Sequence, residues 1–479
     1  MVIYVHQEYI ININYLSRFQ YIQVVHQSFS SLHTDMGIPH FLAIPYPILG
    51  HMNPLLQFCE VLGKYNCKIT FLSSDENYKK LIKSSASGGQ ESHVKLVSLP
   101  DGVDPEDDRK DQSKVILTTT NTMRAKLPKL IEDINAVDSG NNNISCIIVT
   151  KNMGWALELA HQLGIKGALF WPASATSLAS FNSIQALIDA GFLDSETGLP
   201  IKTREIQLSS NLPLMEAAAM PWYCVDNAFF FLHMKQEMQK VNLGEWWLCN
   251  TTLDLEAGAF STSPKLLPVG PLMAISDRNI SSLWEEDKTC LEWLDQQQPQ
   301  SVIYVSFGSM VSTKPNQFKE LALALDLLNR PFIWVVRKDN GYEVGNAYPD
   351  EFKGKQGKIV SWAPQKKILS HPATACFISH CGWNSTIEGV YNGVPFLCWP
   401  FCSDQLMNKT YICDVWKVGL GFDMDQNGLI SKGEIKNKVE QLLEDEQIKG
   451  RSCKLMEMLI KNKAEGDKNL NKFVNWAKE

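Results

Sequence analysis

The sequence lacks the features that define several classes of protein. No run approaches the ~20 consecutive apolar residues that a membrane-spanning helix needs. None of the 12 cysteines forms a CxxC pair, which argues against a zinc module built on that spacing. No block of lysine and arginine is present, and the formal net charge is -7. This charge balance argues against nucleic acid or an anionic membrane surface as the main partner.

The size and composition of the chain are those of a two-domain globular protein. Its 479 residues are too many for one ordinary core, and 44% hydrophobic with 20% charged residues is typical of a soluble protein. Many cysteines lie in apolar runs such as residues 145–149, which predicts buried, reduced thiols and a cytoplasmic location. Residues 1–35 carry no signal-peptide pattern, so we expect a disordered extension with Met36 as the functional start.

From residue 40 onward, short apolar runs alternate with amphipathic segments. The first series predicts three strands and two helices, at residues 41–45, 68–72, 145–149, 54–64 and 154–163. A Pro/Gly-rich link at 263–272 precedes a second series, which opens with a helix at 291–294 and a strand at 302–305. Strands alternating with helices indicate parallel sheets. We therefore predict an α/β fold of two Rossmann-like domains facing a cleft, with ligands beyond the carboxyl ends of the strands.

A possible anion site lies near the end of the second series. A predicted strand at 375–379 ends at His380, and a glycine-containing loop then leads to Asn384 and Ser385 at the start of a predicted helix, 386–390. The free N–H groups and dipole of a helix N-terminus bind anions, so a diphosphate would fit there without a metal. A simpler interpretation is a capping box between Ser385 and Glu388, with His380 as a core histidine.

The whole stretch from Trp362 to Gln405 resembles the 44-residue signature of plant secondary-product glycosyltransferases, which belong to the family 1 UDP-glycosyltransferases. The resemblance extends over almost all of residues 36–479. It implies a GT-B fold, a UDP-sugar as donor and co-substrate, a small-molecule acceptor, and neither a metal nor a further cofactor.

The resemblance also implies a donor contact for each matching position. At the nucleoside, Trp362 would stack on uracil, Ala363 and Gln365 would contact the base and ribose, and Glu388 would accept hydrogen bonds from the ribose hydroxyls. The implied diphosphate contacts are Ser309, His380, Asn384 and Ser385. The implied sugar contacts are Trp383, Asp404 and Gln405. A terminal glutamine in this signature goes mostly with glucose, which makes UDP-glucose the expected donor.

His51 is the candidate catalytic base. It follows the first predicted strand, and its segment resembles the catalytic-histidine loop of the same family. A histidine suits this task because its pKa lies near working pH. The family usually orients this histidine with an aspartate, which fixes the tautomer and stabilises the imidazolium. In this chain Thr150 occupies the aspartate position, and its neighbours Lys151 and Asn152 are not acidic either.

Residues 423–434 form a second motif, which matches the EF-hand calcium loop at six positions. The preceding residues, 418–422, predict a strand instead of an entering helix. Ser431 and Glu434 are also placed as a capping box for a helix at 435–443. Asp423 and Asp425 further mimic the DxD metal motif of another glycosyltransferase architecture, although they follow the donor signature. We therefore expect no metal at this loop.

The resemblance implies an inverting transfer of glucose to a small lipophilic acceptor, such as a phenolic, flavonoid or terpenoid, by a monomer. The expected parts are an acceptor-binding domain at 36–260, a linker at 261–284, a donor-binding domain at 285–455 and C-terminal helices at 456–479 that pack back towards the first domain. Aromatic residues at 171, 181, 222, 223 and 229–231, with Met220, are near the expected acceptor pocket, with 229–231 better explained as core.

Two other functions stay open at this stage. The threonine at position 150 is compatible with a nucleotide-sugar-binding protein that has weak or lost transfer activity. The loop at 423–434 is compatible with a calcium-responsive interaction module.

Overall fold

The computed structural model describes nine stretches of the chain. They are residues 37–85, 93–104, 111–137, 143–201, 205–223, 228–274, 286–311, 313–337 and 348–479. The expectation for residues 1–35 lies outside these stretches.

The first sheet has seven parallel strands. Their order is β3 (Val94–Leu99), β2 (Lys68–Ser74), β1 (His40–Ile44), β4 (Ile144–Val149), β5 (Lys166–Trp171), β8 (Trp246–Cys249) and β9 (Leu266–Pro268). The first five follow the Rossmann order 3-2-1-4-5, in which the chain changes direction of winding between β1 and β4. This reversal opens a crevice at the carboxyl ends of β1 and β4.

The second sheet repeats this design with six parallel strands. Their order is β12 (Gly357–Val360), β11 (Phe332–Val335), β10 (Val302–Ser306), β13 (Thr374–Ser379), β14 (Phe396–Cys398) and β15 (Gly419–Gly421). The order is again 3-2-1-4-5-6, and its switch point lies between β10 and β13. The predicted α/β class with two Rossmann-like sheets is confirmed.

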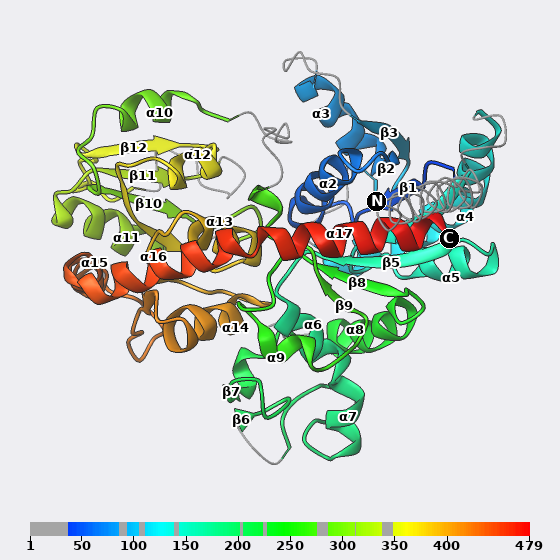
Figure 1. Cartoon of the computed structure of the whole chain (residues 1–479). Helices are drawn as coiled ribbons and strands as arrows, with labels where there is room; N and C mark the ends of the chain where they lie inside the picture. The colour runs from blue at the N-terminus through cyan, green and yellow to red at the C-terminus, as the bar shows by residue number, and fades with distance from the viewer. Residues whose placement is uncertain are drawn as a thin grey trace, which may run out of the picture.

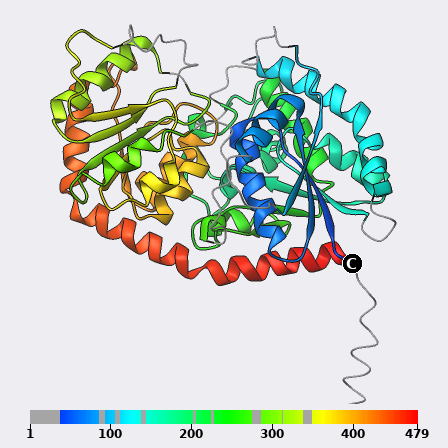
Figure 2. The same ribbon diagram turned by 90° about the horizontal axis from the view of Figure 1, so that it is seen from above.

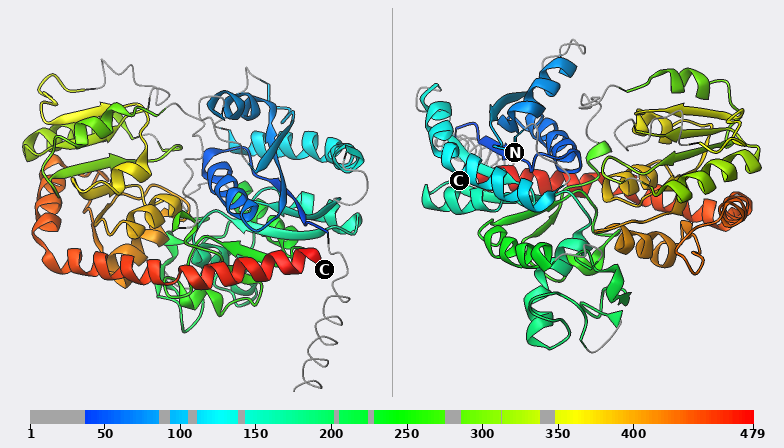
Figure 3. Two further views of the ribbon diagram at one scale, coloured as in Figure 1. Left: turned by 45° about the horizontal axis from the view of Figure 1, so that its top comes forward. Right: turned by 180° about the vertical axis from the view of Figure 1, so that it is seen from behind.

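Helices cover both faces of each sheet and produce two lobes that lie side by side (Figures 1 and 3). The helices of the first lobe are α2 (Leu49–Gly63), α3 (Asp75–Ser85), α4 (Gln112–Val137), α5 (Trp155–Gln162), α6 (Ala175–Asn182), α7 (Ile184–Asp189), α8 (Ala228–Val241) and α9 (Ala257–Phe260). A short antiparallel pair, β6 (Glu205–Ile206) and β7 (Met215–Glu216), and two 3-10 turns, η1 (Ala217–Ala219) and η2 (Leu272–Ala274), complete the described part of that lobe.

The second lobe has α10 (Thr289–Leu294), α11 (Pro315–Leu328), α12 (Gln365–Leu369), α13 (Trp383–Tyr391), α14 (Gln405–Thr410), a π-helical turn η4 (Tyr411–Val415) and α15 (Lys432–Glu444). In the described stretches, no helix combines the length and low charge that crossing a bilayer requires.

Side-chain alternation along β1 shows why both faces of the first sheet need covering. Leu42 and Ile44 belong to one buried cluster, whereas Phe41 and Ala43 belong to the cluster on the opposite face. Strands buried on both faces read as continuous apolar runs, which is why residues 40–44 carry no polar alternation. The first cluster includes side chains from α4, α5, α6 and α8, and the second includes those of α2.

The last two helices, α16 (Glu446–Lys461) and α17 (Lys463–Lys478), run along one side of the molecule from the second lobe to the first (Figures 1 and 2). On α17, Leu470 and Phe473 are fully buried in the core of the first lobe, where the Phe473 ring stacks on Phe41 at 5.5 Å. The side-chain amide of Asn469 donates to the carbonyl of Pro268 at 2.9 Å. The exact domain boundaries at residues 260, 285 and 456 remain our proposal.

Candidate active site between the two lobes

One cavity of about 510 Å³ is bordered by both lobes. His51 and Lys151, which follow β1 and β4, line it from the first lobe, and Ser309 and His380, which follow β10 and β13, line it from the second. Each pair therefore extends from the switch point of its sheet, where parallel α/β sheets bind ligands. The cavity also brings together the other predicted donor residues, namely Trp362, Ala363, Gln365, Trp383, Asn384, Ser385, Glu388, Asp404 and Gln405.

His51 lies in the first turn of α2, because this helix begins at Leu49 and not at the predicted residue 54. Its side chain is only 8% exposed, and its Nδ1 lies 2.9 Å from Oγ1 of Thr150. The same oxygen accepts a hydrogen bond from the backbone N–H of Tyr46 at 2.8 Å. The structure thus places Thr150 against the imidazole, where the sequence comparison expects an aspartate.

The surroundings of His51 keep its imidazole neutral. Burial lowers the pKa of His51 well below its usual value, and the positive charge of Lys151 lowers it further. Thr150 carries no charge that would oppose these effects. A neutral imidazole is the form that a general base needs, but in the described part of the chain no carboxylate contacts the ring to stabilise the imidazolium.

His380 stands between two glycines of the second lobe. A Cβ added to Gly308 or to Gly382 would meet its Nε2 at 2.7 or 2.5 Å, so the close approach of the ring requires glycine at both positions. Cys381, between His380 and Gly382, adopts a left-handed φ of 65°. Ser379 Oγ accepts from the N–H of Cys381 at 3.1 Å, and Asn408 donates to its carbonyl at 2.9 Å.

The His380 ring is neutral for the same physical reason as that of His51. Burial lowers the pKa of His380 to about 4, and Arg337 lowers it as well, although a hydrogen bond with the backbone at Ser306 opposes the change. Its Nε2 is the ring nitrogen that faces Gly308 and Gly382. A neutral imidazole at this position contributes a hydrogen bond to an anion without adding a positive charge.

The first turn of α13 borders the cavity, and the alternative interpretation, a capping box between Ser385 and Glu388, is wrong. Gly382 is the N-cap and the helix begins at Trp383, so Ser385 lies inside it. The predicted start of this helix, at residue 386, is therefore three residues too late. The N–H groups of the first turn that have no partner within the helix belong to residues 383–385. That of Trp383 is directed at the Asp404 carboxylate, and the other two belong to Asn384 and Ser385, which were predicted to hold the diphosphate.

Glu388 is held by a side-chain network in place of a capping bond. Nε2 of Gln365 donates to Oε2 of Glu388 at 2.7 Å and to Oγ of Ser385 at 2.9 Å, and Tyr304 donates to Oε1 of Gln365 at 3.2 Å. Burial raises the pKa of Glu388, while Lys366 and Gln365 lower it. Trp362 and Ala363 precede Gln365 in the sequence and line the same cavity.

Asp404 and Gln405 line the cavity from the start of α14. Oε1 of Gln405 accepts from the N–H groups of Phe401 and Cys402 at 2.8 and 3.2 Å, which fixes the amide with its Nε2 as the donor for a ligand. Asp404 accepts from Asn408 at 2.7 Å, and burial raises the pKa of this carboxyl. The indole N–H of Trp383 is already donated to the carbonyl of Asn250 at 3.0 Å, and its backbone N–H is bonded to the Asp404 carboxylate.

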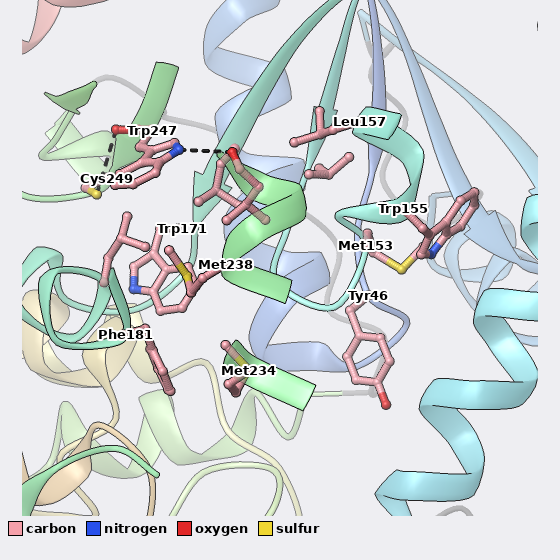
Figure 4. Packing of buried hydrophobic residues seen from close by; sticks show 14 of the residues in the cluster. Tyr46, Met153, Trp155, Leu157, Trp171, Phe181, Met234, Met238, Trp247 and Cys249 are labelled. Atoms are coloured by element: carbon pink, nitrogen blue, oxygen red, sulfur yellow. Dashed lines mark hydrogen bonds between the residues drawn. The ribbon is translucent and has the colours of Figure 1, made fainter. Parts of the chain in front are cut away.

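Aromatic side chains of the first lobe line the rest of the cavity. Trp171 and Phe181 pack edge to face at 5.7 Å, and Figure 4 shows the two rings side by side. Phe230 also lines the cavity, which corrects the interpretation of residues 229–231 as core, although Phe231 is buried as expected. Met220 and Trp222 are buried in the core, and Tyr223 is 39% exposed.

Sequence reasoning passed over Lys151 as a functional residue and treated it only as a non-acidic neighbour of Thr150. It lines the cavity with its ammonium over three aromatic rings, those of Trp171, Phe181 and Phe230. Its position is the signal that could have found it, because a residue just beyond the carboxyl end of a strand at the switch point lies at the ligand side of the sheet.

The loop that resembles an EF-hand has other partners for its carboxylates. Oδ1 of Asp425 accepts from the N–H groups of Asn427 and Leu429, both at 2.8 Å. Glu434 accepts from the N–H of Asp423, and Lys438 lies 3.1 Å from the Asp423 carboxylate. No group of three or more His, Cys, Asp or Glu side chains suited to a metal occurs in the described stretches.

The two predicted elements that flank this loop are confirmed. β15 precedes it as a strand, and Oγ of Ser431 accepts from the N–H of Glu434 at 3.2 Å and so caps α15. The turn therefore has a structural explanation that needs no ion.

Comparison with known proteins identifies relatives along nearly the whole chain. Residues 242–477 match the model of the family described as UDP-glucoronosyl and UDP-glucosyl transferase. The chain is 39% identical over 461 residues to UDP-glycosyltransferase 83A1 of Arabidopsis thaliana, an alignment that covers 92% of this chain and 97% of the relative. It is also 32% identical over 476 residues to linamarin synthase 1 of Manihot esculenta, covering 92% and 96% of the two chains.

The fold has counterparts among solved structures. One is the complex between 3,4-dichloroaniline and a UDP-glucosyltransferase from Polygonum tinctorium that is capable of glucosylating indoxyl. That chain is 25% identical, with a TM-score of 0.77, and the match covers 92% of this chain and 99% of the other.

Proposed function

Since the chain belongs to the UDP-glucoronosyl and UDP-glucosyl transferase family, and is a UDP-glycosyltransferase, we propose that it transfers glucose from UDP-glucose to a small lipophilic acceptor with inversion at the sugar C1. One observation carries the proposal. The candidate base His51 of the first lobe and the candidate donor residues of the second lobe line the same cavity. A single displacement requires this arrangement, because acceptor and donor must meet in one place.

The donor lies along the second lobe in this proposal. Uracil stacks on Trp362, and the ribose hydroxyls donate to Glu388, whose carboxylate is oriented by Gln365. The diphosphate binds at the first turn of α13, beside His380 and Ser309. Glucose then lies against Asp404 and Gln405. The glucosyltransferase from Polygonum tinctorium, which shares the fold, supports glucose as the transferred sugar.

The chemical step follows from the two sides of the cavity. An acceptor oxygen attacks C1 of glucose from the first lobe, while the bond from C1 to the β-phosphate oxygen breaks and UDP leaves with the electron pair. His51 takes the proton when the acceptor is an alcohol. The N–H groups of α13 and His380 stabilise the charge that develops on the diphosphate, a role that fixed dipoles perform well in a water-poor site.

The test is a transfer assay with purified protein, UDP-glucose and a panel of aromatic acceptors, in which UDP release and product mass are both measured. We expect a product heavier than the acceptor by one hexose and a higher kcat/KM for UDP-glucose than for UDP-galactose. Gln405→Ala should narrow that donor preference, whereas Gln447→Ala on the surface of α16 should leave it unchanged. Equal use of both donors by the wild-type protein would refute the assignment of Gln405.

A nucleotide-sugar-binding protein with weak transfer activity is the second candidate, and the contact between His51 and an uncharged Thr150 favours it. It predicts binding of UDP-glucose by calorimetry without hexosylated product from any acceptor. The first proposal predicts both binding and product.

A further inference from the structure

Lys151 is a cation placed inside an aromatic pocket. Its Nζ lies 5.1 Å from the ring centroid of Phe230, 5.5 Å from that of Phe181 and 6.0 Å from that of Trp171. Within the described residues it makes no ion pair or hydrogen bond, and it lines the cavity. Aromatic faces attract a cation but do not replace a direct counter-ion.

The charged groups around Lys151 do not supply that counter-ion by contact. Asp404 and Glu237 favour its charged form from a distance, together with Cys402, and they oppose the burial that lowers the pKa of Lys151. Both carboxylates have nearer partners, because Asp404 accepts from Asn408 and Glu237 accepts from the N–H of Gly154 at 2.7 Å. His51 and His233 lie near Lys151 on other elements, and both are kept neutral.

This arrangement disfavours the removal of a proton from a neutral acceptor. An imidazolium formed on His51 would lie near the Lys151 cation, and Thr150 offers no negative charge to stabilise it. An acceptor that is already an anion avoids this step. Its negative charge would instead form an ion pair with the Lys151 ammonium. Ion pairs are strongest in a partly desolvated site such as this one.

We propose that the acceptor of this enzyme is an apolar or aromatic acid that reacts as its anion, a carboxylate or the phenolate of an acidic phenol, and that Lys151 is the residue that selects it. This proposal rests on the proposed transfer function. The aromatic rings of Trp171, Phe181 and Phe230 bind the body of the acceptor, and the ammonium binds the anionic end.

The reaction balances without a base. The anionic oxygen attacks C1 of glucose, the new C1–O bond forms, and the C1–O bond to the β-phosphate breaks with its electron pair going to UDP. The acceptor loses one negative charge and UDP gains it. The product is a glucose ester from a carboxylate or an aryl glucoside from a phenolate, and no proton is transferred to His51.

The experiment compares matched acceptors with the full-length protein and UDP-glucose near pH 7. One pair is cinnamic acid and cinnamyl alcohol, and the other is 4-nitrophenol and unsubstituted phenol, whose pKa resembles that of tyrosine. The variants are Lys151→Met, which keeps the length and removes the charge, and Lys151→Arg, which keeps the charge. Lys472→Met is the control, because Lys472 lies over the Trp246 ring at 4.5 Å and is not among the residues lining the cavity.

We expect the wild-type protein to favour the anionic member of at least one pair. Lys151→Met should lower the ratio of kcat/KM values, anionic over neutral, by about 10- to 100-fold, the effect of losing one charge-assisted contact. Lys151→Arg and Lys472→Met should retain the ratio. A preference for cinnamic acid over cinnamyl alcohol would indicate a carboxylate acceptor, and a preference for 4-nitrophenol over phenol would indicate a phenolate acceptor.

Two results would overturn the inference, and they differ in what they mean for the proposed function. Equal turnover of anionic and neutral acceptors, or an unchanged ratio in Lys151→Met, refutes the role of Lys151 and leaves glucosyl transfer standing. No product from any acceptor, with intact UDP binding by calorimetry, refutes both. UDP binding by each variant also verifies that it is folded.

Discussion

Replacing Thr150 with aspartate tests whether His51 is a base that lacks its usual charged partner. Oγ1 of Thr150 lies 2.9 Å from Nδ1 of His51, so an aspartate there would place a negative charge next to the ring. An opposite charge at this range typically raises a histidine pKa by about 1–3 units. It would also fix the proton on Nδ1 and leave Nε2 to accept the proton of the acceptor.

The sign of the pH effect follows from the protonation state that a base requires. In the wild-type protein, burial and Lys151 lower the pKa of His51, so transfer to a neutral alcohol should persist well below pH ~6.5, the usual histidine value. In Thr150→Asp the pKa is raised, so activity should be lost at a higher pH as the solution is acidified. The acid limb of kcat/KM should therefore move upward by about 1–3 pH units.

The rate should rise in the same variant for neutral acceptors. A well-placed general base contributes ~10²–10⁴-fold, and the present site holds only part of that arrangement, so we expect a gain of about tenfold or more at pH 8. The assay is kcat/KM with cinnamyl alcohol from pH 5 to 9. Thr150→Asn, which matches the shape of aspartate without its charge, should neither move the acid limb nor raise the rate.

The surroundings of Thr150 leave little room for a larger side chain. Thr150 is fully buried, and its hydroxyl also accepts from the N–H of Tyr46, so the larger aspartate must keep that bond. Thermal unfolding of both variants shows whether the site tolerates the added atom. An acid limb that stays in place in a stable Thr150→Asp protein, or one that moves equally in Thr150→Asn, refutes the electrostatic reasoning.

Three further outcomes are expected. Gly382→Ala should weaken UDP binding at least about tenfold by calorimetry, because the new Cβ would meet Nε2 of His380 at 2.5 Å, whereas Gly433→Ala, with its nearest neighbour at 3.8 Å, should leave binding unchanged. Phe473→Ala should lower the free energy of unfolding by about 3–5 kcal/mol in denaturant titrations, against less than about 0.5 kcal/mol for the exposed Asn471→Ala. EDTA should leave transfer intact if the first turn of α13 binds the diphosphate, and loss of activity that magnesium restores would contradict this.

The fold and the position of the donor residues were predictable from sequence for a definite physical reason. Strands buried on both faces are continuous apolar runs, so residues 40–44 and 374–379 are visible without further information. Their carboxyl ends converge at the switch points, which places whatever follows them, including His51 and His380, at the ligand side. Chain order therefore predicts the location of the two histidines, whereas the roles expected for the other donor residues depend on the family resemblance.

The start of a helix, and which of its side chains face the core, were less predictable. The helix after His380 was expected to begin at residue 386, after Asn384 and Ser385, but it begins at Trp383 and Gly382 is its N-cap. Similarly, three consecutive phenylalanines on α8 point in directions about 100° apart, so Phe231 enters the core while Phe230 lines the cavity. Such differences depend on the rotation of a helix about its axis, which a short apolar run does not define.

The two unusual residues after β4 are best understood together. The Thr150 hydroxyl accepts from Tyr46, and its own proton is free to turn toward or away from Nδ1 of His51, so it does not fix the imidazole tautomer as a carboxylate would. Lys151 then adds a positive charge that opposes the imidazolium. Both residues therefore weaken His51 as a candidate base. If His51 is the base, this double weakening favours an acceptor that brings its own negative charge, as we propose above.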